Sequence, residues 1–219
     1  MVKRFINRLV KLIVRLTNRR SIKGIGNTIR IPFNIWMKNC QVQIIGCNNL
    51  ISVSHMVRLN GVKFYIEGNN NVIDIKHNVN IERGSVLWIE DNGCAIIIGE
   101  KSTFGSVHLA ATEDGSSIRI GKDCMFSDGI DVRTGDSHTV VDLSTGNRIN
   151  QAKNVVIGDH VWCGAHSSIL KGVNVPDGVI IATRSVVTNN RGGYSQNTII
   201  GGLPAKTIKE NITWLRERI

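Results

Sequence analysis

The hydrophobic positions of this chain recur every six residues over its C-terminal part. From residue 157 onward larger apolar residues follow one another at steps of six: Ile157, Cys163, Ile169, Val175, Ile181 and Val187. Four places after each of the first five stands a small or β-branched residue: Val161, Ser167, Val173, Val179 and Ser185. A helix repeats near 3.6 residues and a half-buried strand near two, so neither explains a period of six. Three such units make one triangular coil, and the pattern predicts a β-solenoid with a continuous buried column.

The same register continues upstream when short insertions are allowed. Val53, Ile75, Ile98 and Ile120 are separated by 22, 23 and 22 residues, which is three units of six plus a short insertion. The step from Ile120 to Ile157 is 37 residues, and we expect it to contain two coils, at least one of them with an extra loop. The pattern therefore predicts a single solenoid domain over residues 22–203.

Both ends of the chain depart from the six-residue period. Apolar residues at helical spacing, with basic residues on the other side, predict an amphipathic helix over residues 1–21. Such a helix either caps the coil, packs on another subunit or makes peripheral membrane contact through residues 1–20. Basic residues interrupt its apolar residues every three or four positions, so no apolar run is long enough to span a membrane. Residues 204–219 predict a short helix that caps the other end of the coil.

Composition narrows the class of protein and of partner. The chain has 219 residues, 42% of them apolar, 5% aromatic and 22 of them glycine, which suits short strands and tight turns. Lys and Arg outnumber Asp and Glu by 27 to 17, so the surface should attract an anionic partner. The five cysteines form no CxxC pair, and we expect reduced core thiols in a cytoplasmic protein.

The stretch over residues 154–206 carries a resemblance to a known family. It contains IGDHVWCGAHSSILKGVNVPDGVIIATRSVVTNN and ends in GGLPAK. This stretch resembles the hexapeptide-repeat acyltransferases, in particular the bacterial O-acetyltransferases that modify capsular and other cell-surface polysaccharides. The resemblance implies an all-β, left-handed parallel β-helix, a homotrimer with active sites at subunit interfaces, acetyl-CoA as donor and a carbohydrate hydroxyl as acceptor. It implies neither a metal nor a nucleic-acid partner.

Transfer of an acetyl group to a hydroxyl needs a base, and histidine suits that role near neutral pH. His138 lies in GDSHTVVD, within a segment that breaks the six-residue pattern between residues 133 and 153. Loops that leave a rigid coil are common places for function. Asp136 and Asp142 flank His138, and either one could fix its tautomer. The related acetyltransferases place their catalytic histidine in a similar D-S-H setting, so we expect His138 to be the general base of a direct transfer in a ternary complex. The alternative is a loop histidine that only satisfies a turn.

The other five histidines fit structural positions better. His55 and His77 occupy the same place in successive repeats, which favours a polar outer face. His160 stands one place further on, where other repeats carry different polar residues, and is expected to be structural. The sequence around His108 and His166 suggests no proton relay.

The resemblance also implies a place for Trp162, near the cofactor and the acetyl group. The indole N–H of Trp162 could donate to the oxyanion, as could backbone N–H groups near Cys163 and Gly164. The alternative is that Trp162 only packs against a neighbouring subunit.

Candidate positions for coenzyme A follow from residue size and charge. Gly164, Ala182 and Ser185 are small enough for the backbone to approach pantetheine, although small residues at a corner need no ligand. Lys206 and Arg184 carry charges that suit the phosphates. The family pattern I-G-A-G-S is replaced by IATRS at residues 181–185, which leaves the shape of the slot open.

Rival functions remain open at this stage. A metal enzyme like the γ-type carbonic anhydrases shares the coil, and His160 and His166 would be its candidate ligands. A non-catalytic coil could serve as a scaffold. The enzyme could also acetylate an amino sugar or an antibiotic instead of a polysaccharide.

Overall fold

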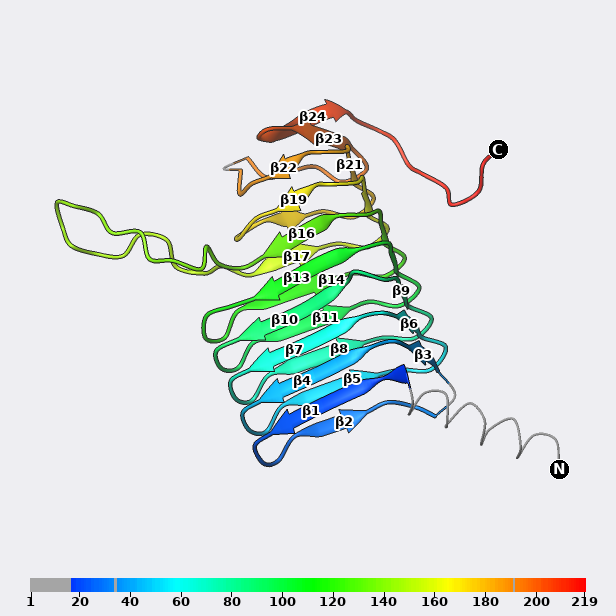
Figure 1. Cartoon of the computed structure of the whole chain (residues 1–219). Helices are drawn as coiled ribbons and strands as arrows, with labels where there is room; N and C mark the ends of the chain where they lie inside the picture. The colour runs from blue at the N-terminus through cyan, green and yellow to red at the C-terminus, as the bar shows by residue number, and fades with distance from the viewer. Residues whose placement is uncertain (1–16, 34, 191) are drawn as a thin grey trace.

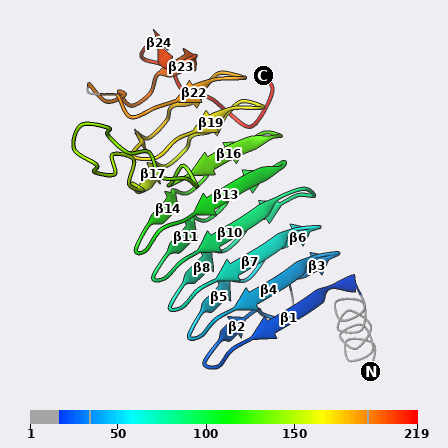
Figure 2. The ribbon, with the colours of Figure 1, turned by 60° about the vertical axis from the view of Figure 1, so that its left-hand side comes forward.

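The chain forms a parallel β-solenoid of about eight turns, and successive strands as far as β22 pass in rotation to three sheets (Figures 1 and 2). The structure is a computed structural model that describes residues 17–33, 35–190 and 192–219. Every strand pair is parallel except the last, between β23 and β24. The arrangement fits the left-handed β-helix that the resemblance implies.

The strands of each sheet are stacked along the coil axis. The first sheet contains β1 (Arg19–Lys23), β4 (Gln41–Ile45), β7 (Lys63–Glu67), β10 (Val86–Glu90), β13 (Val107–Ala111), β16 (Ile130–Arg133), β19 (Ser168–Ile169) and β22 (Val186–Val187). The second contains β2 (Thr28–Arg30), β5 (Leu50–Val53), β8 (Val72–Ile75), β11 (Ala95–Ile98), β14 (Ser117–Ile120), β17 (Val155–Ile157) and β20 (Asn174–Val175). The third contains β3 (Trp36–Lys38), β6 (Arg58–Asn60), β9 (Asn80–Ile81), β12 (Thr103–Phe104), β15 (Met125–Phe126), β18 (Trp162–Cys163), β21 (Ile180–Ile181), β23 (Ile199–Gly202) and β24 (Ala205–Lys209).

The predicted six-residue register is confirmed as the buried column of the coil. The two sets of residues that define it from residue 157 onward are all buried. Upstream, the five predicted repeat starts are direct neighbours in the second sheet, and all are buried: Val53, Ile75, Ile98, Ile120 and Ile157. Parallel pairing satisfies the interior backbone of each coil with the coils above and below it.

One position of the repeat lies at the corner between the second and third sheets and is occupied by unrelated types of residue. Its residues differ in type but share a positive φ of 53–61°: Met56, Asn78, Lys101, Asp123 and His160. A shared left-handed conformation sets the backbone of this corner, whereas the side chain varies. His160 therefore occupies a structural corner, as predicted.

The prediction of two coils between Ile120 and Ile157 is wrong. The two residues pair directly across neighbouring strands, so the 37 residues form one coil. The next coil takes 18 residues, as the pairing of Val156 with Asn174 shows. The remaining length leaves the coil as one long loop between β16 and β17.

The C-terminal capping helix predicted for residues 204–219 is also wrong. Ala205–Lys209 form β24, which pairs antiparallel with β23 and so covers the edge that a helix was expected to protect. Residues 210–219 contain no helix and run back along the coil (Figure 1). Of their apolar residues, Trp214 is buried against a corner of the coil, whereas Leu215 and Ile219 are exposed.

The predicted N-terminal helix falls mostly on residues 1–16, which lie outside the described residues. Residues 19–21 of that prediction belong to β1, so strand structure begins before residue 22. Within the described part of the chain, no helix has the length and apolar character needed to cross a bilayer.

All five cysteines are free, and four of them are buried: Cys40, Cys94, Cys124 and Cys163. Burial raises the pKa of the Cys124 thiol to about 12 and raises that of Cys163 as well. These thiols are core residues, as expected, while Cys47 is only half-buried.

Candidate active site

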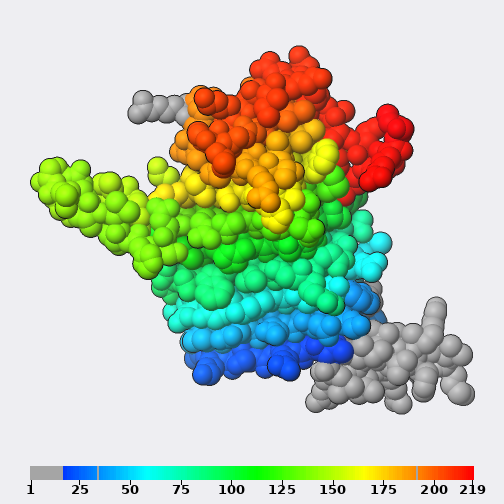
Figure 3. All heavy atoms as spheres, turned by 45° about the horizontal axis from the view of Figure 1, so that its top comes forward, coloured from blue at the N-terminus to red at the C-terminus, as the bar shows by residue number. Residues whose placement is uncertain are grey.

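The loop that carries His138 leaves the coil at the corner between the first and second sheets (Figures 1 and 3). It connects β16 to β17 and folds back on itself as a narrow hairpin. The Ile149 N–H donates to the Val140 carbonyl at 3.0 Å, and Asp142 N–H donates to the Asn147 carbonyl at 2.9 Å. The hairpin therefore has its own backbone hydrogen bonds although it projects into solvent.

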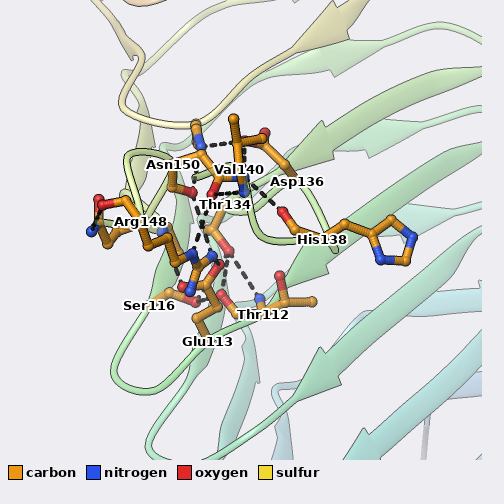
Figure 4. A network of polar contacts seen from close by, with 12 residues as sticks. Thr112, Glu113, Ser116, Thr134, Asp136, His138, Val140, Arg148 and Asn150 are labelled. Carbon is orange, nitrogen blue, oxygen red and sulfur yellow. Dashed lines mark hydrogen bonds and ion pairs between the residues drawn. The ribbon is translucent and has the colours of Figure 1, made fainter. Parts of the chain in front are cut away.

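Asn150 fastens the base of this hairpin around His138 (Figure 4). Its Nδ2 donates to the backbone carbonyl of His138 at 2.7 Å and to Asp136 Oδ2 at 3.0 Å, while its Oδ1 accepts from Val140 N–H at 2.8 Å. Lys171 Nζ bridges to the Asp136 carboxylate and to the Asn150 carbonyl. The Asn150 side chain is buried, whereas Asp136 is exposed, so the network lies at the boundary between the coil and solvent. Sequence reasoning missed Asn150 and Lys171, because no motif links them to His138.

A second anchor ties the hairpin to the preceding coil. Arg148 Nη2 donates to Glu113 Oε1, and Ala152 N–H donates to Glu113 Oε2 at 3.2 Å. The hydrogen bond from Arg148 is the main reason that the pKa of Glu113 lies below its usual value. The backbone of His138 is thus held at a fixed place relative to the coil.

The ring of His138 is exposed and points away from this polar network (Figure 4). Within residues 17–33, 35–190 and 192–219 neither Asp136 nor Asp142 hydrogen-bonds the ring. The bond from Lys171 lowers the pKa of Asp136, and Asp142 accepts bonds from Ser144 that lower its pKa. Asp136 therefore binds side chains at the base of the hairpin, and Asp142 binds the backbone near its tip, at Ser144 and Thr145.

Trp162 lies on the outer face of the third sheet and is 38% exposed. The loop of His138 leaves from the opposite corner, between the other two sheets. One chain therefore does not bring His138 and Trp162 together. The ring centroid of Trp162 is 6.2 Å from that of Trp214 in the C-terminal tail.

The small residues predicted for the cofactor slot are in contact with the coil itself. A Cβ on Gly164 would lie 2.7 Å from Thr183 N and 2.8 Å from the Ile181 carbonyl oxygen, so the next coil requires glycine there. The N–H of Gly164 donates to the same Ile181 carbonyl at 2.8 Å and is not available to an oxyanion. Ser185 is buried, and its Oγ donates to the Ala182 carbonyl at 2.6 Å. These contacts agree with the structural alternative for Gly164 and Ser185.

The two predicted phosphate ligands lie on the surface of the last coils. Arg184 is exposed at a corner with a φ of 59°, and Lys206 is exposed on β24 opposite Gly201. In the described residues neither one forms an ion pair. Both charges are therefore directed to solvent, where an anion can reach them.

Comparison with known proteins places the chain. No protein-family model matches it. The polysialic acid O-acetyltransferase of Neisseria meningitidis is 35% identical over 201 residues, which are 92% of this chain and 91% of that protein. The crystal structure of the polysialic acid O-acetyltransferase OatWY superposes with a TM-score of 0.84, at 34% identity and with 92% of each chain covered. The chain belongs to the polysialic acid O-acetyltransferase family.

A second structure supports the same family and fold. The polySia-specific acetyltransferase NeuO matches with a TM-score of 0.76 and 31% identity, over 91% of this chain and 83% of that one. Membership shows that the chain is an acyltransferase with the hexapeptide-repeat fold.

His108 of this acyltransferase has an acidic partner that sequence reasoning missed. His108 Nδ1 lies 3.0 Å from Asp131 Oδ1 on neighbouring strands of the first sheet, because the coil spacing brings residues 23 apart side by side. Burial alone would raise the pKa of Asp131, but hydrogen bonds from His108 and Arg133 outweigh it and lower the pKa to about 2. The 22–23-residue period of the coil would have predicted this pair, because it places His108 beside Asp131 as it places apolar residues beside one another.

The candidate metal ligands His160 and His166 do not belong to a cluster of metal-binding side chains in the described residues. His160 is engaged by Asp123 and by the carbonyl of Trp214. Among the residues that the structure describes, no three or more His, Cys, Asp and Glu side chains are grouped as metal ligands.

Proposed function

We propose that this acyltransferase moves an acetyl group from acetyl-CoA to a hydroxyl of an acidic cell-surface polysaccharide of the polysialic acid kind. The observation that carries the proposal is the His138 ring, exposed on a loop whose backbone is fixed by a buried asparagine. The acceptor class is supported by the relative from Neisseria meningitidis, which matches over nearly the whole chain.

In the proposed reaction, His138 acts as general base in a ternary complex. It takes the proton of the acceptor hydroxyl as the oxygen attacks the thioester carbonyl carbon. The tetrahedral intermediate then collapses, the C–S bond breaks, and His138 returns the proton to the sulfur of coenzyme A. The indole N–H of Trp162 is the proposed donor to the oxyanion. No acetylated residue forms on the protein.

The proposed active site is shared between two copies of the chain in a homotrimer. In one chain His138 and Trp162 lie on different sides of the coil, so a neighbouring copy must supply one of them. The hairpin supports this arrangement, because it carries exposed apolar side chains that a neighbour would cover: Val140, Val141, Leu143 and Ile149.

For the donor, we propose that Lys206 and Arg184 bind phosphates of coenzyme A. Both are exposed cations on the last coils, on the side of the chain that also carries Trp162. The backbone near Gly164, Ala182 and Ser185 would shape the slot for pantetheine, with the Ser185 hydroxyl turned inward. Because cells hold acetyl-CoA in the cytoplasm, we propose that the enzyme works there.

The test is an acetyl-transfer assay with the purified full chain. It is incubated with labelled acetyl-CoA and, in parallel, with polysialic acid, free sialic acid and neutral dextran, and O-acetylation is read by NMR. We expect label in polysialic acid, and His138→Ala should lower kcat at least about a hundredfold while calorimetry still detects coenzyme A binding. The matched control is His55→Ala, at an exposed corner of the coil. Near-normal turnover in His138→Ala would contradict the proposal that His138 is the general base. Absence of label from every acceptor would contradict the proposed class of acceptor.

A further inference from the structure

The excess of positive over negative charge in this protein comes from its N-terminal third. Residues 1–66 contain twelve Lys and Arg and no Asp or Glu, and the first acidic residue is Glu67. The rest of the chain has fifteen Lys and Arg against seventeen Asp and Glu. Seven of these twelve lie in the described residues, and they belong to the first turns of the solenoid, because the chain climbs the coil axis in order.

The described basic residues of this end are not neutralised by neighbours. Six are exposed and one is half-buried, and we call these seven the basic end: Arg19, Arg20, Lys23, Arg30, Lys38, Arg58 and Lys63. Within the part of the chain that the structure describes, none of them forms an ion pair. Later coils differ, because Lys122, Arg133 and Arg148 each pair with a carboxylate there. The basic end thus carries an unopposed positive field.

Apolar side chains are exposed among these charges. Ile25 is 79% exposed, Ile22 45% and Trp36 42%, and the guanidinium of Arg58 lies over the Trp36 ring at 5.3 Å. The strands β1, β2 and β3 are the outermost of the coil, so these side chains belong to its first turn (Figure 1). Basic residues mixed with isoleucine and tryptophan suit the headgroup region of a bilayer, where cations meet phosphate and apolar groups reach the acyl boundary.

We infer that the basic end of the coil docks on an anionic lipid surface. A second copy of the chain is a poor occupant, because end-to-end contact would set like charges against each other. A soluble polyanionic glycan satisfies the charges but leaves the exposed isoleucines in water. A lipid surface satisfies both. The docking is separate from acetyl transfer, since the loop of His138 leaves the coil several turns away.

The test is co-sedimentation of the full-length chain with vesicles of phosphatidylcholine alone or with about one third phosphatidylglycerol. We expect binding only to the anionic vesicles, and release at high salt. Each basic residue near an anionic surface adds roughly fivefold to partitioning, so Arg20→Glu/Lys23→Glu/Arg30→Glu should lower it at least about a hundredfold. A second variant, Ile25→Ser, should weaken binding without changing charge.

A matched variant separates the docking surface from general electrostatics. Arg83→Glu/Lys101→Glu/Arg119→Glu changes the net charge equally at exposed positions of later coils and should retain binding. Equal loss in both triple variants, or equal binding to neutral vesicles, overturns the proposal. So does binding of soluble polysialic acid by the basic end when vesicles are not bound. Circular dichroism checks that both variants are folded, and acetyl transfer in solution should be unaffected in each.

Discussion

His160 and Trp214 lie face to face, with ring centroids 4.1 Å apart and planes 4° apart, and they fasten the C-terminal tail to the coil. The indole Nε1–H of Trp214 donates to the His160 carbonyl at 2.8 Å. The two ring nitrogens of His160 face Asp123 Oδ2 at 2.8 Å and the Trp214 carbonyl at 3.0 Å. The imidazole of His160 is thus held between the coil and the tail from both of its nitrogens.

Removal of the Trp214 ring should release the tail. The side chain is 4% exposed, and Trp214→Ala is expected to lower the free energy of unfolding by about 2–4 kcal/mol. Limited proteolysis should then cut within residues 210–219 in the folded protein. Leu215→Ala is the control, because Leu215 is exposed and should change neither quantity. A tail of Trp214→Ala that resists protease as well as the unmodified chain contradicts this role.

Acid should weaken the protein through Asp131. Its pKa in the folded chain is about 2, below the usual value near 4, so its contribution to stability is present above pH 4 and is lost as pH falls toward 2. Asp131→Asn should cost about 2 kcal/mol at neutral pH and little at pH 2, as measured by urea unfolding across that range. Glu210→Gln, at an exposed position, should leave the acid limb unchanged. A deficit in Asp131→Asn that is equal at both pH values would assign the loss to packing instead.

The sequence predicted the coil because burial in a solenoid repeats at one spacing. Ile157 and the apolar residues at steps of six after it could be read directly, and the 22–23-residue period placed Val53 and Ile75 in the same column. The 37-residue step misled the prediction, because length alone does not distinguish an extra coil from a loop. The prediction of a C-terminal helix failed for a similar reason. Apolar residues at helical spacing are also compatible with a strand, here β24, followed by an extended tail in which Trp214 is buried.

Only the part of the candidate site that a motif or a break in the repeat marks could be predicted from the sequence. His138 could be singled out because the segment around it breaks the repeat. Its anchors could not, because Asn150 reaches the His138 carbonyl only after the hairpin folds back, and Lys171 of a later coil then binds the Asn150 carbonyl. The flanking aspartates were the natural candidates to orient the ring, yet in the single chain both bind elsewhere. Sequence spacing shows that these aspartates are near His138 along the chain, but the direction of each side chain depends on the folded loop.

Gly164 should be intolerant of a side chain even without any ligand. The nearest atoms to an added Cβ belong to the backbone of the next coil, which cannot move aside alone. We expect Gly164→Ala to lower the free energy of unfolding by about 1–3 kcal/mol, as overpacking of a rigid core does. Gly192→Ala is the control, since an added Cβ there would have only Asn190 Oδ1 at 3.8 Å. Equal melting temperatures for the two variants would show that the coils can separate locally.

Asn150 should act on catalysis through the position of His138. Without its amide, the His138 carbonyl and the Asp136 carboxylate lose a shared donor, and the loop gains freedom. Small displacements of a catalytic group cost up to about a hundredfold in rate, so Asn150→Ala should lower kcat by about tenfold to a hundredfold with the KM for acetyl-CoA little changed. Hydrogen exchange should rise in residues 136–149 and stay constant in the strands. Asn147→Ala changes an exposed side chain at the hairpin tip and should leave kcat intact. A fall in kcat with unchanged exchange would mean that Asn150 touches the substrate itself, because a purely positioning residue cannot slow the reaction while its loop stays in place.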